Sequence, residues 1–165
     1  MPRLALYQPD IPQNTGTILR LAACLGVPVD IIEPAGFDVS DRNFRRAGLD
    51  YLDRVEITRH RSWRTFQEWR TARGHRLVLA TTKSALPYTD FAFTCDDILL
   101  LGRESAGVAA EVHEAADARV NVPMRPGSRS LNVAVAGAMI LGEALRQTNA
   151  FLSPSRVGTG ESPCP

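Results

Sequence analysis

Three polar loops in this 165-residue chain carry residue types that could bind an anion and activate a hydroxyl group. The first loop runs from Gln8 to Gly16 and is followed four residues later by Arg20. Two prolines stiffen the loop, and Asn14 or Thr15 could cap the helix that follows it. The free amides of a helix N-terminus favour an anion, and Arg20 would place a positive charge just behind them. A capped helix with a surface arginine explains the same residues equally well.

The second loop, residues 101–107, places two glycines around the charged pair Arg103 and Glu104. Glycine lets a ligand approach the backbone closely. Glu104 could bind a hydroxyl group or a cation, or it could cap the next helix. The loop is not the GxGxxG of dinucleotide-binding proteins, and no Gly-Lys-Ser/Thr occurs in the chain. The common nucleotide-binding fingerprints are therefore excluded.

The third loop, residues 122–132, ends a strand-like run with a Pro/Gly turn and then opens the longest predicted helix. Ser130, Asn132 and the free backbone amides offer polar contacts at the start of that helix. The helix continues with small apolar residues at 133–138. Either core packing or a helix–helix contact in a dimer would explain this run.

A fourth segment, residues 42–51, holds three arginines and two aromatic residues. Phosphate contacts combined with base stacking would use this mixture of side chains. A solvated helix face above a core Phe44 explains it as well.

The elements that position these loops alternate between strand-like and helix-like patterns. Strands are expected at 4–7, 29–32, 55–57, 76–80, 98–101 and 118–122. Helices are expected at 14–25, 41–47, 62–73, 109–116 and 132–148, with Ser62 as one N-cap and Gly26 as one stop. This alternation predicts a single-domain α/β fold, in which a mostly parallel sheet is flanked by helices. Ligands in such sheets bind outside the carboxyl ends of the strands, where the loops lie.

Composition is that of an ordinary globular domain, with 44% hydrophobic residues, 22% charged residues and a net charge of +1. No apolar run approaches the roughly 18 residues that a membrane-spanning helix needs, and the N-terminus lacks a signal-peptide pattern. A cytoplasmic protein with no membrane partner is therefore expected. Residues 1–149 are expected to form the domain. Residues 150–165, rich in Ser, Pro and Gly, are expected to be a disordered tail.

The basic residues and the cysteines indicate which kinds of ligand, nucleic acid or metal ion, the protein could bind. Lys83 is the single lysine among 19 basic residues, and arginine suits bidentate phosphate contacts and base stacking. The three cysteines show no metal-binding spacing with the three histidines, so reduced thiols and no metal are expected. With a net charge of +1, a nucleic-acid ligand would need a local basic patch.

Taken in order, these motifs resemble those of the SpoU branch of the SPOUT RNA methyltransferases. The resemblance rests on Asn14-Thr15-Gly16 with Arg20, on residues 101–107 and on residues 123–132. Further matches at 6–16, 32–34, 45–51 and 81–83 are similar to the small TrmL-like tRNA wobble-ribose methyltransferases. The resemblance covers about residues 3 to 148. The chain departs from some relatives at Gly142, where they carry tyrosine.

The resemblance implies a fold whose C-terminal part is threaded into a deep trefoil knot. It implies a homodimer that binds S-adenosylmethionine, releases S-adenosylhomocysteine and needs no metal. The substrate would be the anticodon stem-loop of tRNA, methylated on the ribose 2′-hydroxyl of the wobble nucleotide (position 34, cytidine or modified uridine). Two alternatives stay open. They are methylation of ribosomal RNA or of another tRNA position, and a catalytically inactive RNA-binding SPOUT protein.

The resemblance also implies roles for individual residues. Those matching the catalytic positions are Arg20, Asn14 and Glu104. Those matching cofactor-binding positions are Ala80, Thr81, Gly102, Val122, Ser130 and Leu131. Those matching RNA-binding positions are Arg46, Ser128 and Arg129. Because free arginine is a poor proton acceptor, Arg20 is expected to act first as an electrostatic and positioning group, with general base as the second reading.

Overall fold

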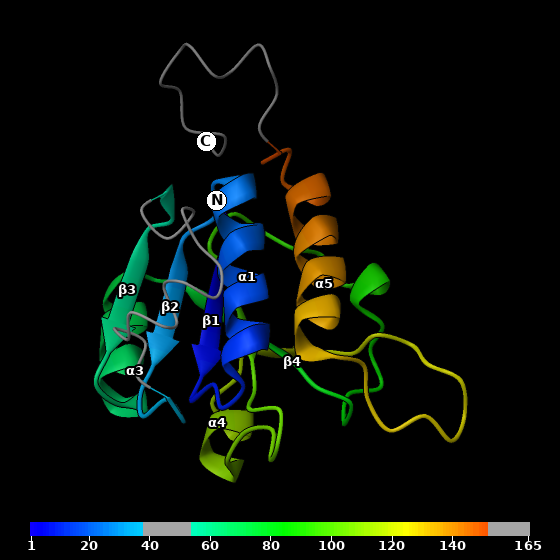
Figure 1. The fold of residues 1–165 in the computed structure, drawn as a ribbon. Coiled ribbons are helices and arrows are strands. Elements are labelled where there is room, and N and C mark those ends of the chain that lie inside the picture. The colour runs from blue at the N-terminus through cyan, green and yellow to red at the C-terminus, as the bar shows by residue number, and fades with distance from the viewer. Residues whose placement is uncertain (38–53, 152–165) are drawn as a thin grey trace.

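Six strands form one parallel sheet in the part of the chain that the structure, a computed structural model, describes: residues 1–37 and 54–151. The strands are β1 (Arg3–Tyr7), β2 (Val29–Ile32), β3 (Ile57–His60), β4 (Arg76–Ala80), β5 (Asp97–Leu101) and β6 (Ala118–Val120). Their order across the sheet is β3-β2-β1-β5-β4-β6, and each pairing is parallel (Figure 1). The predicted parallel α/β sheet is confirmed. Because β5 pairs with β1 in parallel, the loops that follow these two strands lie next to each other at the carboxyl ends of the strands.

Helices cover both faces of the sheet. Helices α1 (Pro12–Leu25) and α5 (Val133–Gln147) pack side by side on one face (Figure 1). Helices α3 (Trp63–Ala72) and α4 (Ala110–Glu114) contribute Phe66 and Val112 to a second core on the other face. A short 3-10 helix, η2 (Tyr88–Asp90), lies between β4 and β5 along the chain. All five residues of β5 are buried, as expected for a strand covered on both sides.

The start of α1 differs from the prediction. The helix begins at Pro12, and its N-cap, Ile11, makes no side-chain capping bond. Proline is well suited to the first helical position because its missing N–H would have no partner there. Asn14 and Thr15 therefore lie inside the helix, and the prediction that one of them caps it is wrong. Gly26 ends the helix as predicted, with a left-handed φ of 67°.

The predicted cap at Ser62 is confirmed, and of the two polar residues expected at the start of the longest helix, Asn132 is the cap. Ser62 forms a capping box with Thr65 at the start of α3. Asn132 caps α5, where its Oδ1 accepts from the backbone amides of Ala134 and Val135 at 2.9 and 3.3 Å. These caps fix where each helix leaves its preceding loop.

The third strand is displaced from its predicted position. It was expected at residues 55–57, whereas β3 spans Ile57–His60. The sequence pattern did not reveal this strand, because most of its residues are polar. The side-chain partners of two of them lie on β2 or just after it. His60 Nε2 lies 2.8 Å from Asp30 Oδ1, and Arg59 Nε donates to Glu33 Oε1 at 2.8 Å.

Some predictions fall outside the described residues: the helix at 41–47, Arg46 within it, and the tail from residue 152 onward. Cys24 is a free thiol, whereas Cys95 is disulfide-bonded, so the prediction of reduced thiols is wrong at Cys95. None of the helices in the described ranges is long and apolar enough to cross a membrane.

Candidate functional site

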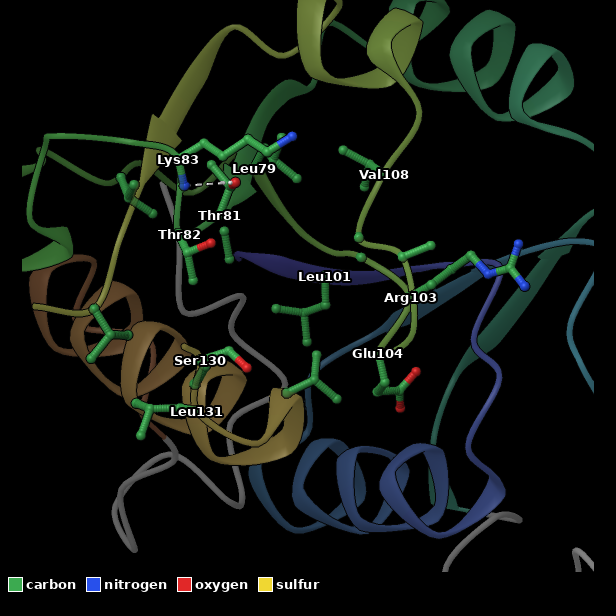
Figure 2. Close-up of a pocket in the computed structure, with 18 of the residues that line it drawn as sticks. Leu79, Thr81, Thr82, Lys83, Leu101, Arg103, Glu104, Val108, Ser130 and Leu131 are labelled. Carbon is green, nitrogen blue, oxygen red and sulfur yellow. Dashed lines mark hydrogen bonds between the residues drawn. The ribbon is translucent and has the colours of Figure 1, made fainter. Parts of the chain in front are cut away.

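A cavity of about 860 Å³ opens at the carboxyl ends of β4, β5 and β6, against the start of α5. It is lined by every residue predicted to bind the cofactor, namely Ala80, Thr81, Gly102, Val122, Ser130 and Leu131. Figure 2 shows Thr81 and Lys83 on one side of it, Ser130 and Leu131 on another, and Leu101 between the two. The three strand-end loops thus meet around one cavity, as expected for ligand sites in parallel sheets.

The cavity wall is closely packed around Gly102. A Cβ atom at this position would lie 3.0 Å from the carbonyl carbon of Gly107 and 3.1 Å from Val108 Cγ1. Gly107 itself has a φ of 67°, a conformation that favours glycine. The two glycines therefore fold the loop after β5 back on itself. The rest of the wall combines polar side chains with aliphatic ones, including Leu101 and Val120.

A chain of hydrogen bonds joins the three motif loops beside the cavity. Asn14 Nδ2 donates to Glu104 Oε1 at 3.2 Å. Asn132 Nδ2 donates to Asn14 Oδ1 at 2.9 Å, while Asn132 Oδ1 caps α5. Glu104 and Asn14, both predicted catalytic residues, are thus in direct contact and both line the cavity. The chain couples the position of the Glu104 carboxyl group to the first turn of α5.

Asp10 continues this chain on the far side of Glu104. Its Oδ1 accepts from the Glu104 amide at 3.1 Å, and its Oδ2 accepts from the Ser105 hydroxyl. The neighbouring Glu104 side chain lowers the pKa of Asp10 to about 2. Burial, and then the neighbouring Asp10 side chain, raises the pKa of Glu104. Arg103 Nε lies 3.7 Å from Asp10 Oδ2.

The other predicted site residues are placed differently. Arg129 lines the cavity, but Ser128 does not. Arg20 is exposed on α1 and does not line the cavity of its own chain. It follows Asn14 by six residues, which at 3.6 residues per turn directs the two side chains to different sides of the helix.

Sequence reasoning assigned no site role to several residues that the fold places here. Thr82, Lys83 and His113 line the cavity, and Asp10 supports Glu104. Thr82 and Lys83 directly follow a predicted strand, which is a signal that could have identified them. Among residues 1–37 and 54–151, no group of three or more His, Cys, Asp or Glu residues could hold a metal ion.

Curated relatives match nearly the whole chain. A protein of Ancylobacter novellus named tRNA (cytidine(34)-2'-O)-methyltransferase is 64% identical over 157 residues, which are 95% of this chain and 98% of the relative. A protein of the same name from Beijerinckia indica is 68% identical over 148 residues, covering 90% of this chain and 92% of the relative.

Solved structures share the fold. One concerned with the 2-OH methylation of C/U34 on tRNA is 40% identical, with a TM-score of 0.84 over 90% of this chain and 97% of that chain. The SpoU methyltransferase AviRb from Streptomyces viridochromogenes, in complex with the cofactor AdoMet, is 30% identical with a TM-score of 0.82. That match covers 91% of this chain and 61% of AviRb. Residues 1–142 match the SpoU rRNA Methylase family, and this chain therefore belongs to that family.

Proposed function

We propose that this protein methylates the ribose 2′-hydroxyl of the wobble nucleotide of tRNA (position 34, cytidine or modified uridine), using S-adenosylmethionine and releasing S-adenosylhomocysteine. The observation that carries the proposal is the single cavity that the three motif loops build at the sheet edge. The substrate is supported by the names of the relatives that match nearly the full chain.

The cavity has the chemistry needed for this cofactor. Its aliphatic wall, including Leu101 and Val122, suits an adenine ring, and the loop ends supply backbone polar groups. Gly102 lines the cavity and carries no side chain, so a ligand could approach the backbone closely there. When bound, the sulfonium supplies an activated methyl group.

The chain's own residues would orient and activate the hydroxyl group. Arg20 would hold a neighbouring phosphate or stabilise the negative charge that develops on the 2′-oxygen. Asn14 and Glu104 would shape the pocket through their mutual hydrogen bond. Arg129, at the cavity, would contact the RNA. Much of the rate would come from aligning the hydroxyl group with the methyl group.

An exposed apolar stripe on α5 supports a homodimer. Val135 and Met139 lie one turn apart on α5 and are 50% and 39% exposed, and Leu131, just before the helix, is 39% exposed. Contiguous exposed apolar surface of this kind marks interfaces. Helix α1, which carries Arg20, packs beside α5 (Figure 1). Because Arg20 lies outside its own cavity, a dimer on this face is the arrangement that would offer it a partner's cavity.

Charge on this stripe should dissociate the dimer. We expect Val135→Glu and Met139→Glu each to convert the protein to a monomer, because the carboxylate would be desolvated in the interface. Light scattering after size-exclusion chromatography reports the mass. Leu86→Glu is the matched control, since Leu86 is as exposed as Met139, at 39%, but lies outside α5. A wild-type monomer, or stripe variants that stay dimeric, would contradict the proposed interface.

Filling the space at Gly102 should weaken cofactor binding. Gly102→Ala would push its Cβ against the backbone of Gly107 at a cost of about 1–3 kcal/mol of stability, and the shifted loop should bind the cofactor more weakly. Calorimetric titration with S-adenosylhomocysteine measures this. Gly142→Ala is the control, because a Cβ at Gly142 would meet nothing within 4 Å. Unchanged affinity of Gly102→Ala would contradict a role for the loop after β5 in cofactor binding.

The remaining parts of the proposal follow from family membership. They are the deep trefoil knot in the C-terminal part of a domain spanning residues 1–149, and a cytoplasmic location. Knots are rare in proteins, so the knot is proposed here on the ground of the resemblance to the family.

Methyl transfer to RNA tests the function. Labelled S-adenosylmethionine is offered to total tRNA and to ribosomal RNA from a host that lacks this activity. We expect label in tRNA, as a 2′-O-methylated pyrimidine. Label in ribosomal RNA alone, or at another tRNA position, would keep the chemistry and overturn the substrate. No label despite cofactor binding would favour an RNA-binding protein without catalysis.

A further inference from the structure

The loop after β4 presents three consecutive polar side chains to the cavity. Thr81, Thr82 and Lys83 all line it, and Figure 2 shows them together on one side. Lys83 is the single lysine of the chain. Its ammonium group is a compact charge on a flexible stem, which differs from the planar fork of an arginine. This segment therefore gives one wall of the cavity a positive charge and two hydroxyl groups.

The backbone of this loop is fixed against the neighbouring strand end. The Ser84 hydroxyl donates to the carbonyl of Arg119 on β6 at 2.8 Å. Asn121 Nδ2, just after β6, donates to the Ser84 carbonyl at 2.6 Å. Within the turn, the Lys83 amide donates to Thr81 Oγ1 at 3.2 Å. The backbone of Lys83 is thus held in place, whereas its side chain is exposed.

The donors of this loop are not used up by the protein itself. Among residues 1–37 and 54–151, nothing pairs with the Thr82 hydroxyl or the Lys83 ammonium group. Glu104 and Glu114 are the acids that line the cavity in this part of the chain, and neither forms an ion pair with Lys83. The Thr81 hydroxyl accepts from the Lys83 amide, and its own proton remains available. Three such donors, one of them charged, suit a carboxylate, which accepts at two oxygens.

The other cationic side chains at the cavity are directed elsewhere. In the described ranges, the lysine and arginine residues that line it are Lys83, Arg103 and Arg129. Arg103 Nε lies 3.7 Å from Asp10 Oδ2, and Figure 2 shows the side chain pointing away from Leu101. Arg129 lies in the loop before α5, where we propose a contact with RNA. Lys83 is the cation that remains for a ligand held inside the cavity.

The proposed cofactor has one negatively charged group, the carboxylate of its methionyl part. Its adenine and ribose are neutral, while its sulfonium and amino groups are positive and would be repelled by an ammonium group. We propose that Lys83, together with the hydroxyl groups of Thr81 and Thr82, binds the methionyl carboxylate. This inference rests on the proposed function and assigns a subsite to the amino-acid end of the cofactor.

Three ligands of decreasing length test this subsite by calorimetric titration. They are S-adenosylhomocysteine, S-adenosyl-3-thiopropylamine, which lacks only the carboxylate, and 5′-methylthioadenosine, which lacks the whole amino-acid end. Lys83→Met should weaken S-adenosylhomocysteine about 5- to 30-fold, because a charge-assisted hydrogen bond at an exposed side chain is lost. The affinity for the other two ligands should stay within about twofold of the wild type.

Two further variants separate the charge from the hydroxyl group. Lys83→Arg keeps the charge and should recover most of the lost affinity for S-adenosylhomocysteine. Thr82→Val removes one neutral donor and should weaken that ligand about 2- to 5-fold. Arg125→Met is the matched control, because Arg125 is an exposed cation of the loop after β6 that does not line the cavity.

The outcomes are distinct from those of the proposed function. A wild type that binds S-adenosylhomocysteine but methylates no RNA would overturn the function, while the ligand series would still test the subsite. Equal weakening of S-adenosylhomocysteine and 5′-methylthioadenosine by Lys83→Met would place the contact on the adenosine end and overturn the inference. So would unchanged S-adenosylhomocysteine affinity with a raised KM for tRNA, which would make Lys83 a phosphate contact. A wild type that does not bind S-adenosylhomocysteine would overturn both.

Discussion

Replacing Arg20 with alanine should reduce kcat for methyl transfer about 100- to 1,000-fold, the usual effect of removing one preorganised group that stabilises developing negative charge. Cofactor affinity should stay at the wild-type value, because Arg20 does not line the cavity. Single-turnover transfer to tRNA and calorimetry with S-adenosylhomocysteine measure the two quantities. Arg64→Ala removes the same side chain from an 87% exposed position on α3 and serves as the control.

Mixed dimers would show which cavity Arg20 serves. An Arg20→Ala subunit retains an intact cavity, and a Gly102→Val subunit retains Arg20. If Arg20 acts across the dimer, each mixed dimer has one complete site. Random pairing of the two inactive variants should then restore about a quarter of wild-type activity. Absence of restoration in verified mixed dimers would contradict action across the interface. A kcat for Arg20→Ala equal to that of Arg64→Ala would remove Arg20 from the mechanism altogether.

Replacing Asp30 with alanine should lower the free energy of unfolding by about 3–5 kcal/mol, the usual cost of removing one partner from a buried ion pair. Asp30 is fully buried on β2. Its Oδ2 accepts from Arg3 Nε at 3.0 Å, and its Oδ1 lies 2.8 Å from His60 Nε2. The variant would leave the Arg3 charge 12% exposed without this partner.

Urea unfolding followed by circular dichroism measures this loss. Glu68→Ala is the control, because its ion pair with Arg64 is exposed and should contribute less than about 1 kcal/mol. Cofactor affinity of the Asp30 variant should be unchanged in the folded protein, since Asp30 does not line the cavity. A loss of stability no larger than that of the control would contradict the importance of this buried contact.

Much of the fold follows from local patterns in the sequence. The continuous apolar run that becomes β5 and the caps at Ser62 and Asn132 were sufficient to place their elements. The pattern failed at β3, where Ile57 is followed by three polar residues, the last of which, His60, is buried against Asp30. Periodicity also carries no information on strand order. That β5 lies between β1 and β4 depends on contacts between distant segments.

The location of the candidate site could also be predicted from the sequence, but some of its residues could not. The predicted loops after the strands directed attention to the carboxyl ends of the strands. The residues predicted to contact the cofactor line one cavity there. Asp10 was missed because its contact with Glu104 exists only when β1 pairs with β5. Residue spacing places Arg20 on α1, but it does not show whether the side chain reaches the cavity of its own chain. The sequence alone therefore could not show that Arg20 lies outside that cavity.

A tRNA that lacks a single hydroxyl group tests the central claim most directly. A tRNA that accepts label is assembled with 2′-deoxycytidine at position 34, and a matched tRNA carries the deoxy substitution at a neighbouring anticodon-loop position. With labelled S-adenosylmethionine, we expect the matched tRNA to accept label at the unmodified rate and the position-34 deoxy tRNA to accept none. Equal labelling of both tRNAs would contradict methylation of the wobble ribose.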